Sequence, residues 1–132
     1  MNLPRPGTFQ TRKCEGTILI ADDDPAVRSV LASVLRRNHF AVLTACDGPQ
    51  ALALARGFGG AIDLLLTDFE MPDLTGIQLA AAIRQLFPHI SVILMSGLPN
   101  WETAGESIST FLRKPFTPLA MLETITGLLG QR

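Results

Sequence analysis

The sequence predicts an α/β fold in which helices cover both faces of a parallel β-sheet. Five short apolar segments are continuous rather than alternating with polar residues, which is typical of strands buried on both faces. The segments between them place apolar residues at helical spacing, and such alternation builds a doubly wound parallel sheet. With 132 residues, of which 47% are hydrophobic and 17% charged, the chain is large enough for one domain with its own core.

Each predicted strand is one of these continuous apolar segments. The five segments cover residues 17–21, 40–45, 62–67, 90–95 and 110–113. Residues 1–16 lack any periodicity and contain two prolines and two glycines. We therefore expect a flexible leader over residues 1–16 and a single domain over residues 17–132.

Helices are predicted after the first, second, third and fifth strands. The first begins with Asp24 as N-cap and Pro25 at the first helical position, where both residue types are favoured. The second ends in the glycine-rich stretch 57–60, the third stops at Pro88, and the last follows Pro118. Between the fourth and fifth strands apolar anchors are few, so a short or irregular fourth helix is expected there.

Composition excludes several classes of protein. The 11 basic and 12 acidic residues give a net charge of −1, which argues against direct binding of nucleic acid. No apolar run approaches the ~18 residues of a membrane span, and the first residues contain no apolar core of a secretory signal. The two cysteines, Cys14 and Cys46, are too few for a disulfide framework, so reduced thiols and a cytoplasmic location are expected.

Polar side chains follow four of the five predicted strands. In a parallel sheet these positions meet at one edge, outside the carboxyl ends of the strands. The group consists of three consecutive carboxylates after the first strand, then a carboxylate, a hydroxyl and an ammonium after the third, fourth and fifth: Asp22, Asp23, Asp24, Asp68, Ser96 and Lys114.

Carboxylates gathered in this way require compensating charge. Two carboxylates about 5 Å apart at an effective dielectric constant of about 20 repel by roughly 3 kcal/mol. Lys114 and a bound divalent cation would offset this repulsion, and a set of oxygen ligands alone favours Mg²⁺. A carboxylate beside Mg²⁺, a hydroxyl and a lysine are the groups that phosphoryl transfer uses, so the expected product is an aspartyl phosphate.

Four motifs occur in order along the chain: ILIADDDPAVR, LLLTDFEMPDLTG, VILMSG and FLRKPFTP. In these motifs the chain resembles the receiver domain of two-component response regulators, including the chemotaxis-regulator-like members, from about Thr17 to Leu129. The resemblance implies a flavodoxin-like, doubly wound, five-stranded parallel sheet with strand order 2-1-3-4-5 and helices on both faces.

The resemblance also implies a role for each acidic residue at the strand ends. Asp68 is expected to be the phosphoacceptor. Asp22 and Asp23 are expected to be the acidic pair that binds Mg²⁺, with Asp23 the more direct ligand. Asp68 itself and the backbone carbonyl of Glu70 complete the expected set of protein ligands.

Three further roles are implied by the same resemblance. Ser96 is expected to carry the hydroxyl that moves toward the phosphoryl group, and Lys114 to form a salt bridge with it. The Lys114–Pro115 peptide bond is expected to be cis. Phe111 takes the position of the switch aromatic residue, and because it lacks a hydroxyl it would act through packing alone.

Other carboxylates are expected to have structural roles only. Asp24 is expected to cap a helix rather than bind metal, and Asp73 to serve as a turn or cap residue. Asp63 precedes the apolar run of its predicted strand and therefore belongs at the opposite edge of the sheet. Asp47 is assigned no role.

The expected function is a phosphoacceptor switch in a two-component system or phosphorelay. Asp68 would take a phosphoryl group from a sensor histidine kinase or a phosphotransfer protein, and phosphorylation would change contacts with a downstream protein. The chain would catalyse only its own phosphorylation and dephosphorylation, as a monomer or weak dimer that contacts neither DNA nor membrane.

Three alternatives remain open. The chain could be a pseudo-receiver, which keeps the fold and binds partners without phosphorylation, or the receiver fragment of a hybrid histidine kinase. A hydrolase with an aspartyl-phosphate intermediate is disfavoured. That chemistry uses a second Asp two residues after the nucleophile, and Glu70 occupies this position.

Overall fold

The structure, a computed structural model, describes residues 14–97 and 107–130. Its five parallel strands form one sheet in the order β2-β1-β3-β4-β5, as predicted. The strands are β1 (Thr17–Ala21), β2 (Ala41–Ala45), β3 (Leu64–Asp68), β4 (Ser91–Ser96) and β5 (Thr110–Arg113). The helices are α2 (Pro25–Arg37), α3 (Gly48–Gly57), α4 (Gly76–Leu86) and α5 (Pro118–Leu129).

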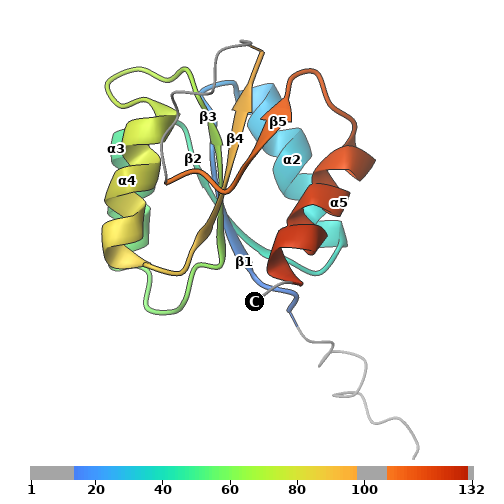
Figure 1. The fold of residues 1–132 in the computed structure, drawn as a ribbon, viewed down its shortest axis with the longest axis horizontal. Coiled ribbons are helices and arrows are strands. Elements are labelled where there is room, and N and C mark those ends of the chain that lie inside the picture. Colours follow the sequence, from blue (N-terminus) through green and yellow to red (C-terminus); the bar gives the residue numbers. More distant parts are fainter. Residues whose placement is uncertain (1–13, 98–106, 131–132) are drawn as a thin grey trace, which may run out of the picture.

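The sheet separates two apolar cores, one on each face. Figure 1 shows α2 and α5 on one face of the sheet and α3 and α4 on the other. In β3, Leu64 and Leu66 pack into the core beneath α2 and α5, while Leu65 packs into the core beneath α3 and α4. This burial on both sides explains why the strand segments are continuously apolar.

Side-chain caps fix the start of each helix. Asp24 Oδ1 accepts hydrogen bonds from the backbone amides of Ala26 (2.9 Å) and Val27 (3.4 Å), which confirms Asp24 as the N-cap of α2. Thr75 and Gln78 form a reciprocal capping box at α4. Asp73 lies in the preceding turn with a positive φ of 71°, so it is a turn residue and Thr75 is the cap.

Three predicted strands begin one or two residues too early. The amide of Phe40 donates to Leu35 O (3.1 Å), and the amide of Ile90 donates to Phe87 O (3.0 Å). Both residues are buried, but their amides complete the ends of α2 and α4 instead of joining the sheet. At the other end, β3 and β4 extend by one residue and thus include Asp68 and Ser96.

Two expectations from the sequence lie outside the described residues. They are most of the leader, residues 1–13, and the short helix expected after β4, most of which falls on residues 98–106. Of the leader, Glu15 donates its amide to His39 O (2.8 Å), just before β2. Among the helices that the structure describes, none combines the length and apolar character needed to cross a membrane.

Candidate phosphoacceptor and metal site

Three carboxylates meet at the carboxyl edge of the sheet. Asp22 and Asp23 directly follow β1, and Asp68 is the last residue of β3, the strand paired with β1. One oxygen from each of the three lies within 4.8 Å of the others. Asp22 is fully buried, Asp68 is half-buried and Asp23 is exposed, so the cluster opens to solvent on one side.

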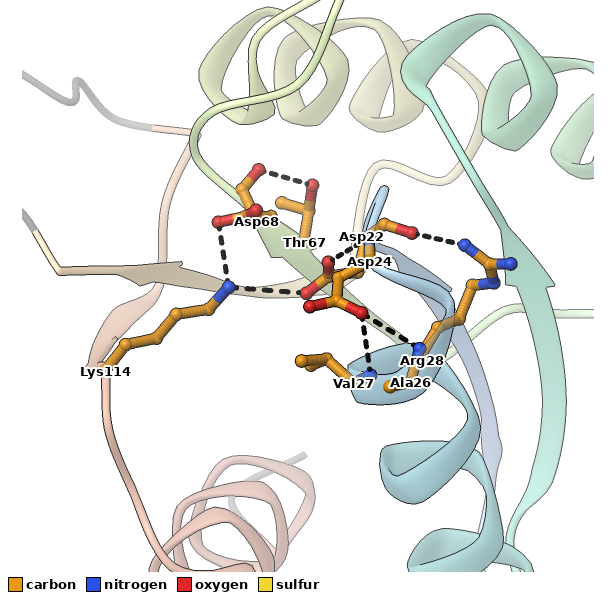
Figure 2. A network of polar contacts seen from close by, with 8 residues as sticks. All are labelled: Asp22, Asp24, Ala26, Val27, Arg28, Thr67, Asp68 and Lys114. Atoms are coloured by element: carbon orange, nitrogen blue, oxygen red, sulfur yellow. Dashed lines mark hydrogen bonds and ion pairs between the residues drawn. The ribbon is translucent and has the colours of Figure 1, made fainter.

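Lys114 joins this cluster from the far end of the chain. Its ammonium lies 3.4 Å from Asp22 Oδ2 and 3.3 Å from Asp68 Oδ1. Figure 2 shows the Lys114 side chain directed between these two carboxylates. The backbone amide of Lys114 donates to the carbonyl of Ser96 (3.0 Å), which ties the residue after β5 to the end of β4. The Lys114–Pro115 bond is cis, as predicted from the sequence.

Hydrogen bonds on both sides fix the position of Asp22. Its Oδ1 accepts the backbone amide of Asp24 (2.9 Å), and its backbone carbonyl accepts Nη1 of Arg28 (2.7 Å). Figure 2 shows Arg28 on the side of Asp22 away from Lys114. Because Asp24 also caps α2, the Asp22 carboxylate and the start of the helix are held by the same turn of chain.

Hydrogen bonds to backbone carbonyls fix the end of β3 and the loop that follows Asp68. Thr67 Oγ1 donates to Asp68 O (3.0 Å), and the amide of Phe69 donates to Met95 O (2.9 Å). The amide of Gly76 donates to Phe69 O (2.9 Å), and a Cβ at Gly76 would overlap the carbonyl oxygen of Asp68. Glycine at this position therefore allows α4 to begin directly against the loop that follows Asp68.

The charges of Asp68 and Lys114 depend on each other. Burial raises the pKa of Asp68 above its ordinary value, the nearby Lys114 ammonium opposes that change, and the Asp22 and Asp23 carboxylates reinforce it. Burial alone would lower the pKa of Lys114, but the Asp22 and Asp68 carboxylates outweigh it and raise the pKa. Lys114 therefore remains protonated. The ionised form of Asp68 is disfavoured by its burial and by the two neighbouring carboxylates.

The donor set fits a hard divalent cation. Three carboxylates face one ammonium, so negative charge is in excess, and all the clustered ligand atoms are oxygen. The expected fourth contributor, Glu70, lines a cleft of about 390 Å³ together with Asp23, directly beside the cluster. Mg²⁺ suits such an incomplete protein cage because it retains several water ligands.

The two expected switch residues lie on neighbouring strands. Ser96 is the last residue of β4 and is 4% exposed, while Phe111 is half-buried on β5 opposite Leu94. The structure therefore brings Ser96 and Lys114 to the edge where the carboxylates meet, with Phe111 three residues before Lys114 on the adjacent strand. Their roles in switching remain predictions.

The sequence reasoning missed four residues that position the site or the elements beside it. Arg28, Thr67 and Gly76 have the contacts described above. Asp47, which was given no role, caps α3 by accepting the amide of Gln50 (2.7 Å), while Gln50 Oε1 accepts the amide of Cys46 (2.6 Å). The Asp-x-x-Gln spacing carried this last signal, whereas no sequence pattern marked the short-range contacts that Arg28, Thr67 and Gly76 make around the strand ends.

Comparison with known proteins agrees with this geometry. The sequence model of the response regulator receiver domain matches residues 18–126. Among curated proteins, the DNA-binding transcriptional regulator NtrC of a Bradyrhizobium strain is 37% identical over 117 residues, covering 85% of this chain and 24% of the relative. Sensor kinase CckA of Brucella abortus is 29% identical over 120 residues, covering 88% of this chain and 13% of the relative. The chain thus spans a quarter or less of the length of these two relatives.

Solved structures give the same answer. The receiver domain of the hybrid histidine kinase CckA aligns with a TM-score of 0.76 and 38% identity, covering 86% of this chain and 99% of that one. The chemotaxis response regulator CheY4 of Vibrio cholerae aligns with a TM-score of 0.78 and 25% identity, covering 86% and 98%. The chain belongs to the response regulator receiver domain family of two-component signalling.

Proposed function

We propose that Asp68 accepts a phosphoryl group from the phosphohistidine of a sensor histidine kinase or a phosphotransfer protein. The observation that carries this proposal is the position of Lys114, whose ammonium lies 3.3 Å from Asp68 and 3.4 Å from Asp22. One cation that bridges a candidate nucleophile and a buried acidic residue is suited to hold the negative charge of an incoming phosphoryl group.

The transfer itself requires little of the protein beyond positioning. A carboxylate oxygen of Asp68 attacks phosphorus while the bond from phosphorus to the histidine nitrogen breaks, and the bonding pair remains on the imidazole. The product is an acyl phosphate on Asp68. Lys114 and the Ser96 hydroxyl would then hold the phosphoryl oxygens. Beyond this reaction and the hydrolysis of its product, the chain would act as a switch rather than as an enzyme on other substrates.

The metal in this proposal is Mg²⁺. Its protein ligands would be Asp22, Asp23, Asp68 and the backbone carbonyl of Glu70. The bound ion would offset the negative charge of the three carboxylates that Lys114 alone does not neutralise. The three carboxylate oxygens within 4.8 Å of one another support this assignment. Lys114 keeps its own role, because its ammonium contacts the buried oxygen of Asp22 directly.

The proposed output is a change in contacts with another protein. Movement of Ser96 toward the phosphoryl group would leave space that Phe111 fills, and the face formed by β5 and α5 would repack. A cytoplasmic location, a monomer or weak dimer, and no direct contact with DNA are parts of the same proposal. The similarity to the CckA receiver supports the alternative in which the chain works as part of a hybrid histidine kinase.

Intact mass spectrometry tests this proposal. The protein is incubated with a small acyl phosphate, with and without Mg²⁺, as wild type, Asp68→Asn and Asp73→Asn. Asp73 is the matched control, since it is an exposed carboxylate in the same loop and its positive φ suits asparagine. We expect one phosphoryl group to be added in the presence of Mg²⁺ to wild type and Asp73→Asn, and none to Asp68→Asn.

The opposite result identifies the pseudo-receiver. If the folded wild-type protein binds Mg²⁺ but takes up no phosphoryl group from either an acyl phosphate or a phosphohistidine donor, the phosphoacceptor proposal is wrong. The chain would then be a binding module that keeps the fold of the family.

A further inference from the structure

A second polar surface lies on the outer side of α2, next to the edge strand β2. It is a groove of about 540 Å³, which we call the basic groove. Its polar lining consists of three arginines and three hydroxyl residues: Arg28, Arg36, Arg37, Ser29, Ser33 and Thr44. None of these residues belongs to the acidic cluster, although Arg28 also contacts the backbone of Asp22.

One wall of the basic groove is an open sheet edge. Among the described strands, β2 has a neighbour on one side only, namely β1. The amide of Ala41 and the carbonyl of Ala45 both bond toward the β1 side, with Gly16 and Asp22 respectively. Because backbone groups alternate along a strand, those of Val42 and Thr44 face the open edge. Such an edge is a template for another strand.

The other wall carries uncompensated positive charge. Within residues 14–97 and 107–130, no carboxylate forms an ion pair with Arg28, Arg36 or Arg37. Two of the three guanidinium groups do bond to backbone carbonyls. Arg28 donates to Asp22 O (2.7 Å) and Arg36 to Val42 O (3.3 Å), so the Arg36 side chain reaches across to the edge strand. These bonds fix the arginines in place without neutralising them.

We propose that the basic groove binds an acidic segment of a partner protein in extended conformation, added as a strand at the open edge of β2. Its backbone would pair with the amide of Val42, whose carbonyl Arg36 already contacts, and with Thr44, and its carboxylates would meet the arginines of α2. The spacing fits: Arg28 and Arg36 are eight residues apart, which is ~12 Å along a helix, and four residues of an extended strand span ~13 Å. Acidic residues at positions i and i+4 of the segment would therefore reach both.

Three other occupants fit less well. Residues 1–13 of this chain contain three basic residues and no acidic residue. Their charge has the same sign as that of the basic groove, so the two would repel each other. A second copy paired edge to edge about a two-fold axis would bring its own arginines against these. A nucleic acid would satisfy the charge, but it offers no ladder of amides and carbonyls to the open edge of β2.

The test is a titration of the full chain with a defined probe. The probe is a fluorescent peptide of valine and threonine residues with glutamates at positions i and i+4, and its control carries glutamines instead. Arg37→Glu removes an arginine that is exposed and has no other assigned contact, while Arg56→Glu makes the same change on α3, outside the basic groove. Circular dichroism is used to check that both variants fold. If Arg37→Glu does not fold, Arg37→Gln replaces it in the titration.

We expect saturable binding of the glutamate peptide to wild type and Arg56→Glu, weakened about tenfold in Arg37→Glu because the basic groove loses one positive charge and gains a negative one. We also expect slower hydrogen exchange at the amides of Val42 and Thr44 in the complex. The proposal is overturned if the glutamine peptide binds equally, if Arg37→Glu binds as wild type does, or if the two amides are not protected. It is also overturned if a single-stranded oligonucleotide displaces the peptide and binds more tightly.

Discussion

The carboxylate of Asp68 lies where burial and two neighbouring carboxylates disfavour its charge, and one ammonium favours it. Burial is the largest of these effects, and the net result is a pKa raised above the ordinary value of 3.8. The folded protein thus binds this proton more tightly than the unfolded chain does. The stabilisation that the proton provides is present below the ordinary pKa and is lost as the pH rises through the folded-state pKa. At neutral pH the ionised Asp68 therefore opposes folding.

Removing this charge should stabilise the protein when Mg²⁺ is absent. In EDTA at pH 7 we expect Asp68→Asn to have a higher thermal midpoint than wild type, because the amide is neutral and nearly isosteric. The difference should shrink toward pH 4, where the wild-type carboxyl binds its proton. Added Mg²⁺ should raise the midpoint of wild type and have little effect on the variant. A lower midpoint for Asp68→Asn in EDTA at pH 7 would contradict this account of the site.

The adjacent residues Asp23 and Asp24 should separate metal binding from helix capping. Asp24→Ala removes the cap of α2 and should lower the free energy of unfolding by about 1 kcal/mol, with Mg²⁺ affinity retained. Asp23→Ala should change stability in EDTA by less than about 0.5 kcal/mol, because Asp23 is exposed, but should weaken Mg²⁺ binding. Urea denaturation and calorimetric Mg²⁺ titration measure the two quantities. Equal losses of Mg²⁺ affinity in both variants would show that the assignment of Asp24 is wrong.

At the scale of elements, the start of α4 packs directly against the loop after β3 and fixes its position. The amide of Gly76 binds Phe69 O, and its Cα faces the carbonyl of Asp68 with no room for a side chain. Gly127, in α5, has nothing within 4 Å of an added Cβ. The two glycines therefore form a matched pair for substitution by alanine.

Gly76→Ala should lower the free energy of unfolding by about 1–3 kcal/mol, because the new methyl group forces α4 away from Asp68. It should also slow phosphoryl uptake from a small acyl phosphate, because the acceptor loop moves with the helix. Gly127→Ala should raise stability by about 0.5–1 kcal/mol and leave uptake unchanged. If Gly76→Ala is as stable as wild type and takes up phosphoryl groups at the same rate, the close contact does not position Asp68.

The elements also show how far the sequence alone could go. Apolar continuity predicted every strand, since both faces of the sheet are buried, and β1 and β5 match to the residue. The errors fall at Phe40, Ile62 and Ile90, which are buried but precede their strands. A hydrophobicity pattern records burial and not the direction in which an amide bonds, so these ends could not be predicted. The same holds for Arg28 and Gly76, whose contacts with Asp22 and with the loop after Asp68 depend on how the chain turns at the ends of the strands.

For the whole molecule, the sheet connects the edge that carries Asp68, the proposed phosphoacceptor, to the face formed by β5 and α5. Ser96 ends β4, its carbonyl binds the amide of Lys114, and Phe111 lies on the neighbouring strand. A displacement at Ser96 is thus one strand away from the proposed output face. Both apolar cores pack on β1, β2, β3 and β4, and the core beneath α2 and α5 also includes β5, so such a displacement repacks side chains without separating layers.

This connection can be tested with beryllofluoride, a mimic of the phosphoryl group. With Mg²⁺ and the mimic, amide resonances of β5 and α5 should shift in wild type. In Ser96→Ala the shifts should be confined to the loops around Asp68, because no hydroxyl moves toward the mimic. Phe111→Leu, which keeps an apolar side chain at the switch position, should show reduced shifts in α5. Unchanged resonances across β5 and α5 in wild type would contradict the proposed switch.

The measurement that tests the central claim most directly locates the phosphoryl group within the chain. The phosphorylated protein is treated with borohydride, which reduces an acyl phosphate to the corresponding alcohol, and its peptides are sequenced by mass spectrometry. Our account predicts homoserine in place of Asp68, dependent on Mg²⁺, with every other carboxylate unchanged. Reduction at Asp22 or Asp23 instead, or phosphate that survives borohydride on a serine or histidine, would contradict it.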